Sequence, residues 1–264
     1  MVEKIEQIEE NAIEQSGIAR VIPCKELDTF ECFKWISLGI NDFMNAKAIS
    51  LAYGVIFTAL PISIYFLVVS TGWHLVIFPA MVCFMLVGPF LAAGLYDVAW
   101  QFEKNHKPSF THSIKAMSRN AVNEWGFALM LMIFMIFWLR VASIIHALYP
   151  SYLEPTLPNL WPFLIVGTIV GIMFTTIAFF LTAFTQPILL ERKVDLGTAV
   201  LTSINAVWKN KAPMFVWAMV ISLSVLIGFV TFFFAFLIIM PIIGYASWHA
   251  YIDTIETKRE RGFE

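Results

Sequence analysis

Six long apolar stretches, separated by short polar segments, dominate the chain. They lie at 48–69, 73–99, 125–148, 161–189, 213–230 and 232–252. A transmembrane helix needs about 20 consecutive apolar residues. The last two stretches form one run of about 40 residues, which as a single helix would be about 60 Å long, twice the hydrocarbon thickness. This run must fold back, and Gly228 is the expected turn. The pattern predicts an all-α polytopic membrane protein with six transmembrane helices, arranged as three helical hairpins.

The segment before the first apolar stretch is amphipathic. Asp28 and Glu31 are typical of a helix start, and the helix would cover residues 29–45. Its apolar positions recur at helical spacing and are Phe33, Ile36, Ile40 and Phe43. A helix of this kind lies in the membrane interface rather than crossing it. We expect it along the cytoplasmic surface, with Phe33, Ile36 and Phe43 toward lipid or protein.

The chain shows an internal threefold pattern in which an amphipathic cytoplasmic segment leads into each hairpin. Ile40-Asn41 before Lys47-Ala48 resembles Ile204-Asn205 before Lys211-Ala212, and a weaker copy begins near Ile114. The second helix of each hairpin carries a proline, followed eight residues later by a polar residue. These pairs are Pro89 and Asp97, Pro187 and Asp195, and Pro241 and His249. Each proline is expected to kink its helix. The alternative is chance matching among apolar segments.

Charge sets the predicted orientation. Apolar residues make up 59% of the chain and charged residues 14%, far from the values of soluble domains. All but one of the 17 Lys and Arg residues fall on one side of the six-span pattern, and Arg140 is the exception. The positive-inside rule then places both termini in the cytoplasm. The net charge of −2 favours no nucleic-acid partner.

Three parts follow along the chain. Residues 1–27 form an acidic cytoplasmic N-terminal arm, residues 28–255 form the six-helix transmembrane domain, and residues 256–264 form a charged cytoplasmic tail. The lipid bilayer is therefore the first partner that the sequence implies, and we expect bound phospholipid.

Arg140 is the permanent charge inside a predicted span. An intramembrane Arg costs a few kcal/mol on insertion scales. Its long stem can reach the outer interface and contact Glu154 or a lipid phosphate. The other interpretation is a contact with a ligand or with a partner subunit.

Four further polar residues are candidate contact or ligand positions. His249 lies in Trp248-His249-Ala250-Tyr251, which is typical of an interfacial belt of aromatic side chains. Asp97 and Asp253 are expected at inner helix ends, facing water. Gln186 precedes a proline, so it can bond a carbonyl that the kink frees or line a cavity.

Motifs with a known mechanism are scarce. Gly167 and Gly171 form a GxxxG, which permits close helix contact but is common in membrane helices. The chain contains no HExxH, P-loop, GxSxG or Rossmann glycine pattern. We therefore predict no catalytic residues, metal ligands or cofactor.

Several segments resemble an uncharacterised bacterial family of predicted integral membrane proteins, the domain-of-unknown-function family 2189. They are Gly88 to Asp97, Pro187 to Asp195, Met214 to Ala218, Pro241 to Gly244 and Trp248 to Tyr251. The resemblance covers roughly residues 25–255 and implies six spans. The family's ending resembles Gly-His-Ala-Thr-Trp-His-Ala-Tyr, and this chain has Tyr245 and Ser247 within it, so one of the two family histidines is missing. Some family members carry labels linking them to cytochrome c oxidase, but five His in the whole chain are too few for a catalytic oxidase subunit.

The sequence leaves three functional hypotheses. The first is an accessory or scaffold subunit of a larger inner-membrane complex with other membrane-protein subunits, a respiratory, cytochrome oxidase-associated complex being one candidate. The alternative is a transporter or channel for a small or amphiphilic solute, since repeated hairpins and proline-broken helices are features of transporters. The third is an enzyme acting on lipid, with Asp97, His249 or Asp253 as acid or base.

Overall fold

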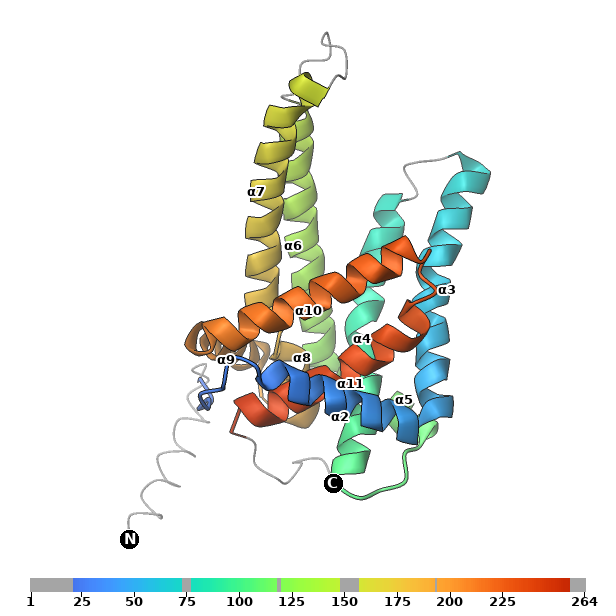
Figure 1. Ribbon diagram of the computed structural model, residues 1–264, viewed down its shortest axis with the longest axis vertical. Coiled ribbons are helices and arrows are strands. Elements are labelled where there is room, and N and C mark those ends of the chain that lie inside the picture. The colour runs from blue at the N-terminus through green and yellow to red at the C-terminus, as the bar shows by residue number, and fades with distance from the viewer. Residues whose placement is uncertain (1–20, 73–76, 118–119, 148–156, 193, 257–264) are drawn as a thin grey trace.

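The computed structural model describes residues 21–72, 77–117, 120–147, 157–192 and 194–256 (Figure 1). Every regular element in these ranges is a helix, apart from an isolated bridge between Cys24 and Ile255. The helices are α2 (Glu31–Asn45), α3 (Lys47–Thr71), α4 (Ile77–Glu103), α5 (Phe110–Ala116), α6 (Ala121–Ala147), α7 (Leu157–Thr182), α8 (Thr185–Glu191), α9 (Leu196–Lys209), α10 (Lys211–Val230) and α11 (Phe236–Thr254). The predicted all-α fold is confirmed.

Five stretches in the described ranges are long and apolar enough to cross a membrane. They are α3, α6, the run Leu160–Glu191 that contains most of α7 and all of α8, α10 and α11. α4 is also long, but the side chains of its first ten residues lie outside the described part. The chain is therefore a multi-pass integral membrane protein, and the sixth span stays a prediction.

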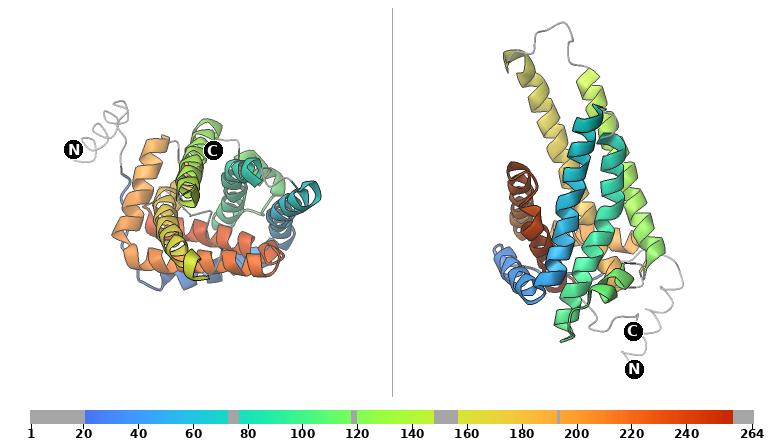
Figure 2. Two further views of the ribbon diagram at one scale, coloured as in Figure 1. Left: turned by 90° about the horizontal axis from the view of Figure 1, so that it is seen from above. Right: turned by 90° about the vertical axis from the view of Figure 1, so that its right-hand side faces the viewer.

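Two groups of helices cross one another. α3 and α4 run side by side, as do α6 and α7, whereas α10, α11 and α2 cross in front of them obliquely (Figures 1 and 2). α11 lies in the middle of this arrangement and packs against α2, α3 and α4. It therefore forms the centre of the hydrophobic core.

The core is built around the aromatic side chains of α11. Tyr245, Trp248 and Tyr251 are fully buried, and the hydroxyls of Ser50 and Tyr245 lie 2.8 Å apart in a hydrogen bond. Tyr251 donates a hydrogen bond to Glu191. The expected interfacial belt at Trp248 to Tyr251 is therefore wrong, because these rings fill the interior where α2, α4 and α8 meet α11.

The predicted kink at Pro187 is a break between two helices, whereas Pro89 and Pro241 lie inside the continuous helices α4 and α11. Pro187 has no N–H to donate to a carbonyl four residues back, and the helix ends at Thr182 and restarts as α8 at Thr185. The predicted span 161–189 is thus two helices. Pro187 lies in the first turn of α8, a position that tolerates a missing donor.

The final apolar run folds back at 231–235, three residues beyond the expected turn. Phe232 and Phe233 take positive φ values of 50° and 68° there, so non-glycine residues make the turn. Gly228 remains helical in α10, and a Cβ on it would lie 1.9 Å from the Phe236 ring. Gly228 therefore admits the ring that closes the turn instead of forming the turn itself.

Each short amphipathic helix packs against the second long helix of another unit. α5 packs against α4, α9 against α7 and α8, and α2 against α11. The residue eight positions after each proline makes a polar contact at this joint. Asp97 contacts His112 of α5 at 2.7 Å, His249 contacts Asp42 of α2 at 2.7 Å, and Asp195 accepts the N–H of Thr198 in α9. The helix expected over 29–45 is thus α2, and the threefold sequence pattern has a matching set of contacts.

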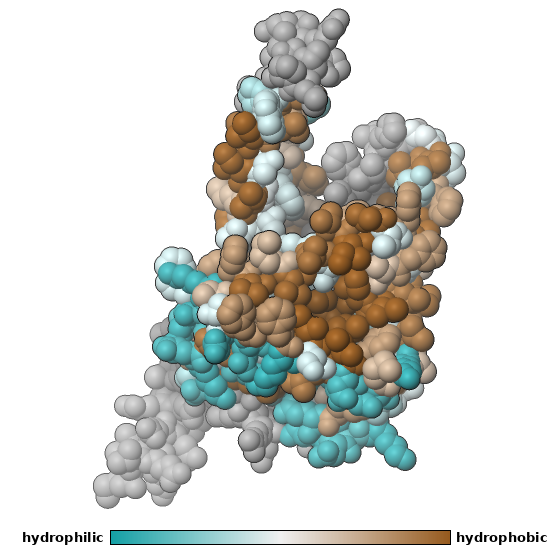
Figure 3. Space-filling model, viewed as in Figure 1, coloured by the Kyte–Doolittle hydropathy of each residue, from teal (hydrophilic) through white to brown (hydrophobic). Residues whose placement is uncertain are grey.

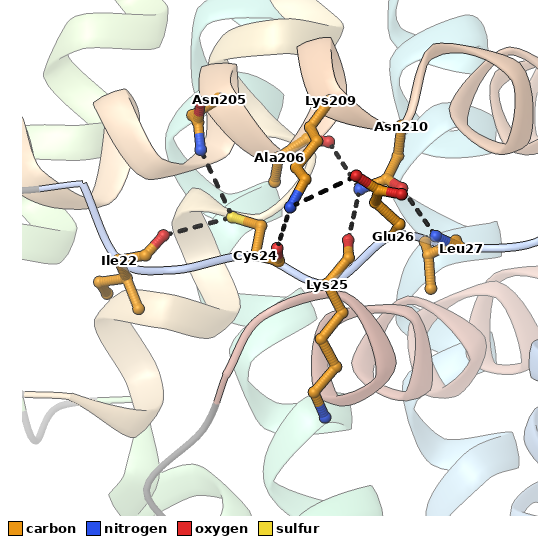
Figure 4. A network of polar contacts seen from close by, with 9 residues as sticks. All are labelled: Ile22, Cys24, Lys25, Glu26, Leu27, Asn205, Ala206, Lys209 and Asn210. Carbon is orange, nitrogen blue, oxygen red and sulfur yellow. Dashed lines mark hydrogen bonds and ion pairs between the residues drawn. The ribbon is translucent and has the colours of Figure 1, made fainter.

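An extended segment, residues 21–27, ties the start of the described chain to α9 and to the end of α11 (Figure 4). Asn210 donates to the Lys25 carbonyl and accepts from the N–H of Leu27, each at 2.9 Å. Lys209 donates to the Cys24 carbonyl at 2.8 Å. Burial raises the pKa of the Cys24 thiol, so this sulfur is held as an unreactive part of the packing.

The surface divides into an apolar band and a hydrophilic end. Figure 3 shows apolar residues across the middle of the molecule and hydrophilic residues gathered at the end where α2 and α9 lie. α7 is apolar on all sides, and Ile165, Ile169, Ile172 and Met173 are exposed on it. A helix that is apolar all round and not covered by its own chain requires lipid or another protein around it.

Candidate solute-binding cleft

A cleft of about 350 Å³ lies between α4, α6, α7 and α8. Its walls are almost entirely apolar and include Pro89 and Ala92 of α4 and Phe127, Leu131 and Trp138 of α6. No lining residue carries a charge. A volume in this range and an apolar lining with few polar groups are typical of small-molecule sites.

Gln186 is the amide in this lining. Its side chain is 3% exposed, and neither Nε2 nor Oε1 has a hydrogen-bond partner in the described part of the chain. Because Pro187 breaks the helix, Gln186 lies in the first turn of α8 and faces the cleft. A buried, unpaired amide costs about 1–3 kcal/mol, so its retention points to a partner that the chain itself does not supply.

Glu124, which sequence reasoning missed, lies in the first turn of α6 and is fully buried. Neither carboxyl oxygen has a hydrogen-bond partner among the described residues. It shares a helix face with Phe127 and Leu131, which line the cleft. The sequence signal that could have identified Glu124 was its place, at helical spacing, on the same face as these apolar residues.

Asp97 does not face water as expected. Its side chain is fully buried and accepts a hydrogen bond from Gln101 at 2.7 Å, while His112 contacts the same oxygen at 2.7 Å. The His112 ring also stacks on Trp100. The expectation failed because α5 packs against this part of α4 and excludes solvent from it.

His249 and Asp253 lie on α11 and join it to α2. His249 contacts Asp42 at 2.7 Å, and Asp253 accepts hydrogen bonds from Lys34 and Trp35 at 2.8 and 2.9 Å. The Asp253 side chain is 27% exposed, so it is shielded more than the expected water-facing position implies. Hydrogen bonds to Asp253 and to Glu31 raise the pKa of Lys34, which keeps this cation charged.

Arg140 is exposed on α6 and forms no hydrogen bond or ion pair with any described residue. Its expected partner Glu154 lies outside the described residues. The structure therefore places the predicted positions in three regions. Gln186 lies at the cleft, Asp97, His249 and Asp253 lie at helix joints, and Arg140 lies on the exposed surface of α6.

Metal and dimer motifs add no further site. Within the described ranges, no three His, Cys, Asp or Glu side chains gather as a metal site. A Cβ added to Gly167 or Gly171 would meet nothing within 4 Å, so this GxxxG packs against none of the described helices.

Comparison with known proteins identifies one family. Residues 77–191 match the family described as "Predicted integral membrane protein (DUF2189)", which confirms the resemblance over this segment. The matched segment runs from α4 to the end of α8 and so contains every helix that lines the cleft. No curated protein and no solved structure matches the chain.

Proposed function

We propose that this protein binds an amphiphilic solute in the cleft between α4, α6, α7 and α8, as a carrier or transporter of that solute. The observation that carries the proposal is Gln186, a buried amide with no partner in the described chain at an otherwise apolar cleft. An apolar chain or ring fits the walls, and a neutral hydroxyl or carbonyl head can bond the amide. A charged head has no counter-ion in the lining.

The test uses detergent-solubilised protein and a spin-labelled stearic acid methyl ester as probe. The immobilised fraction of the probe is measured by electron spin resonance in the wild type and in Gln186→Leu. Loss of the bond to the ester carbonyl should weaken binding about fivefold to tenfold, because one hydrogen bond contributes about 1 kcal/mol.

Two controls make the result specific. Thr176→Val removes a hydroxyl that bonds only within α7, outside the cleft, and should leave the affinity unchanged. A spin-labelled alkane lacks the carbonyl and should bind the wild type and Gln186→Leu equally. Equal ester binding by all three proteins would defeat the proposal. If binding does depend on Gln186, a flux assay in proteoliposomes shows whether the protein also transports the bound solute.

A scaffold role in a larger inner-membrane complex is the second candidate. α7 supports it, because only 6% of the most apolar 18-residue window in Leu160–Glu191 is buried and its two GxxxG glycines face open space. Native extraction from the host, followed by sizing, should show a complex with further subunits. A lone monomer with no co-purifying protein would argue against this role.

We further propose a membrane topology of six spans with both ends in the cytoplasm. The hydrophilic end of the molecule and the Lys and Arg residues of the polar segments support it. A cysteine placed at Thr71 should react with an impermeant thiol reagent from outside, and one at Asn105 should not. Both positions are exposed, so accessibility in the fold does not distinguish them. External labelling at Asn105 would overturn this topology.

A further inference from the structure

Glu124 has no role in the binding step described above, and its surroundings make it unusual. It is a carboxyl with no exposed surface in an apolar helix, and both of its oxygens lack a partner in the described chain. A buried carboxylate without a counter-ion is disfavoured strongly, so desolvation favours the protonated form. The start of α6 has the opposite effect, because the positive end of the helix dipole favours negative charge in the first turn. Both protonation states are therefore accessible.

Among the described residues, no ionisable neighbour forms an ion pair with Glu124, while Arg119 and Lys193 lie outside the described part of the chain. α6 packs against α4, α7, α8 and α9, and the described side chains of α7 include no ionisable group. On the other three helices the described Asp, Glu and Lys side chains have other partners. Asp97 contacts His112, Glu103 accepts from Trp248, Glu191 accepts from Tyr251 and Lys209 donates to Cys24. Arg192, which follows α8, lies 4.0 Å from Glu191 and donates to the Glu256 carbonyl.

The position of Glu124 connects it to the cleft. Phe127, one helical turn further along α6, lines the cleft, as do Leu131 and Met135 on the same face. α8, which carries Gln186, packs against α6. The two buried groups without partners thus lie on adjacent helices, one at the cleft and one a turn away from its lining.

We propose that Glu124 is a proton-binding site linked to the cleft, so that it takes up a proton when a neutral amphiphile binds and releases it when the amphiphile leaves. On release, the carboxyl O–H bond breaks and the proton passes to water at the hydrophilic end of the molecule. On binding, a hydronium ion from this water gives a proton back to the carboxylate, and the O–H bond forms again. The proposal rests on the proposed function for the linkage, but the protonation of Glu124 can be tested without any solute.

Infrared spectroscopy tests the proton site by itself. A protonated buried carboxyl gives a carbonyl stretch separate from the amide and carboxylate bands, and a difference spectrum between two pH values isolates it. The wild type should show this band and Glu124→Gln should lack it. Glu103→Gln, on the adjacent α4, should retain the band. The proposal would be overturned if the difference spectra of the wild type and of Glu124→Gln showed the same carbonyl bands.

The pH dependence of probe binding tests the linkage. Wild-type affinity for the spin-labelled ester should fall severalfold as pH rises, because ionised Glu124 opposes a neutral occupant. Glu124→Gln imitates the protonated form and should bind the ester equally at every pH, while Glu103→Gln keeps the wild-type dependence. A pH-dependent affinity that persists in Glu124→Gln contradicts the linkage. An infrared band without any ester binding would instead refute the proposed solute while leaving the proton site standing.

Discussion

α11 and α7 are both long apolar helices, of 19 and 26 residues, yet α11 lies in the core of the protein and α7 lies on its surface. In the most apolar 18-residue window of α11, 39% of residues are buried, compared with 6% in the corresponding window of Leu160–Glu191, the run that contains most of α7. α11 contacts α2, α3 and α4, whereas α7 packs mainly against α6 and the short helices α8 and α9. Hydropathy alone therefore identifies helices suited to lipid but does not say which of them the protein surrounds.

Small residues explain the difference. A Cβ on Gly54 of α3 would lie 2.0 Å from the Leu237 carbonyl oxygen, and one on Gly39 of α2 would lie 2.7 Å from the Ile242 carbonyl oxygen. The backbones of α2 and α3 thus come into direct contact with α11. Gly167 and Gly171 of α7 meet no other helix of the described chain. In membranes, where apolar surface does not drive association, close packing of this kind holds helices together.

The largest effect on stability is expected when leucine replaces a glycine that contacts another helix, and a glycine that faces open space serves as the control. Gly54→Leu must push α3 away from the Leu237 backbone and should cost about 1–3 kcal/mol or more. Gly171→Leu extends into open space and should change stability by about 0.5 kcal/mol or less. Thermal unfolding in a mild detergent, followed by size-exclusion chromatography, measures both. Equal stability of the two variants would mean that the α3–α11 contact is not tight.

A smaller effect is expected at the joint between α8 and α9. Asp195 caps α9 by accepting hydrogen bonds from the N–H and hydroxyl of Thr198 at 3.0 and 2.6 Å. Partial burial raises the pKa of Asp195, but these hydrogen bonds outweigh burial and leave the pKa below its usual value. Asp195→Ala should cost about 1 kcal/mol at neutral pH.

The pH dependence of this cap has a defined sign. Because the folded-state pKa is lowered, the stabilisation is complete above the unfolded-state pKa and is lost as pH falls through the folded-state value. The gap in melting temperature between the wild type and Asp195→Ala should therefore narrow in acid. A gap that stays constant down to the most acidic pH at which the protein remains folded would contradict the carboxylate's role.

The smallest effect on stability is expected at Arg140, which is exposed on α6. Arg140→Leu removes a charge from an apolar helix without breaking a contact to any described residue, so stability should stay equal or rise slightly. Arg140→Lys should match the wild type, because no bidentate contact is lost. A loss of about 1–3 kcal/mol in Arg140→Leu alone would reveal an acceptor for the guanidinium.

The helices were largely predictable, whereas the burial of their polar side chains was not. The stretches 213–230 and 232–252 correspond to α10 and α11 within a few residues, because hydropathy and length decide which segments form such helices. Asp97 and Trp248 were misplaced, because their burial depends on α5 and on neighbouring helices distant in sequence. For the candidate site, the sequence pointed to Gln186 through its neighbour Pro187, but Glu124 gave only a weak periodic signal.

The sequence by itself determined that the protein is an all-α membrane protein, because insertion into lipid depends on apolar length and on satisfied backbone hydrogen bonds, both local properties. It also indicated an irregularity at Pro187, since a missing N–H acts within one turn, but Pro89 and Pro241 lie inside continuous helices, so the proline alone does not dictate a break. Only the tertiary structure decided that α11 is the core, that Asp97 contacts His112 and His249 contacts Asp42 across helix joints, and that Gln186 faces a cleft. These features depend on which helix faces lie against one another, and in an almost uniformly apolar chain small residues and a few polar contacts decide that choice.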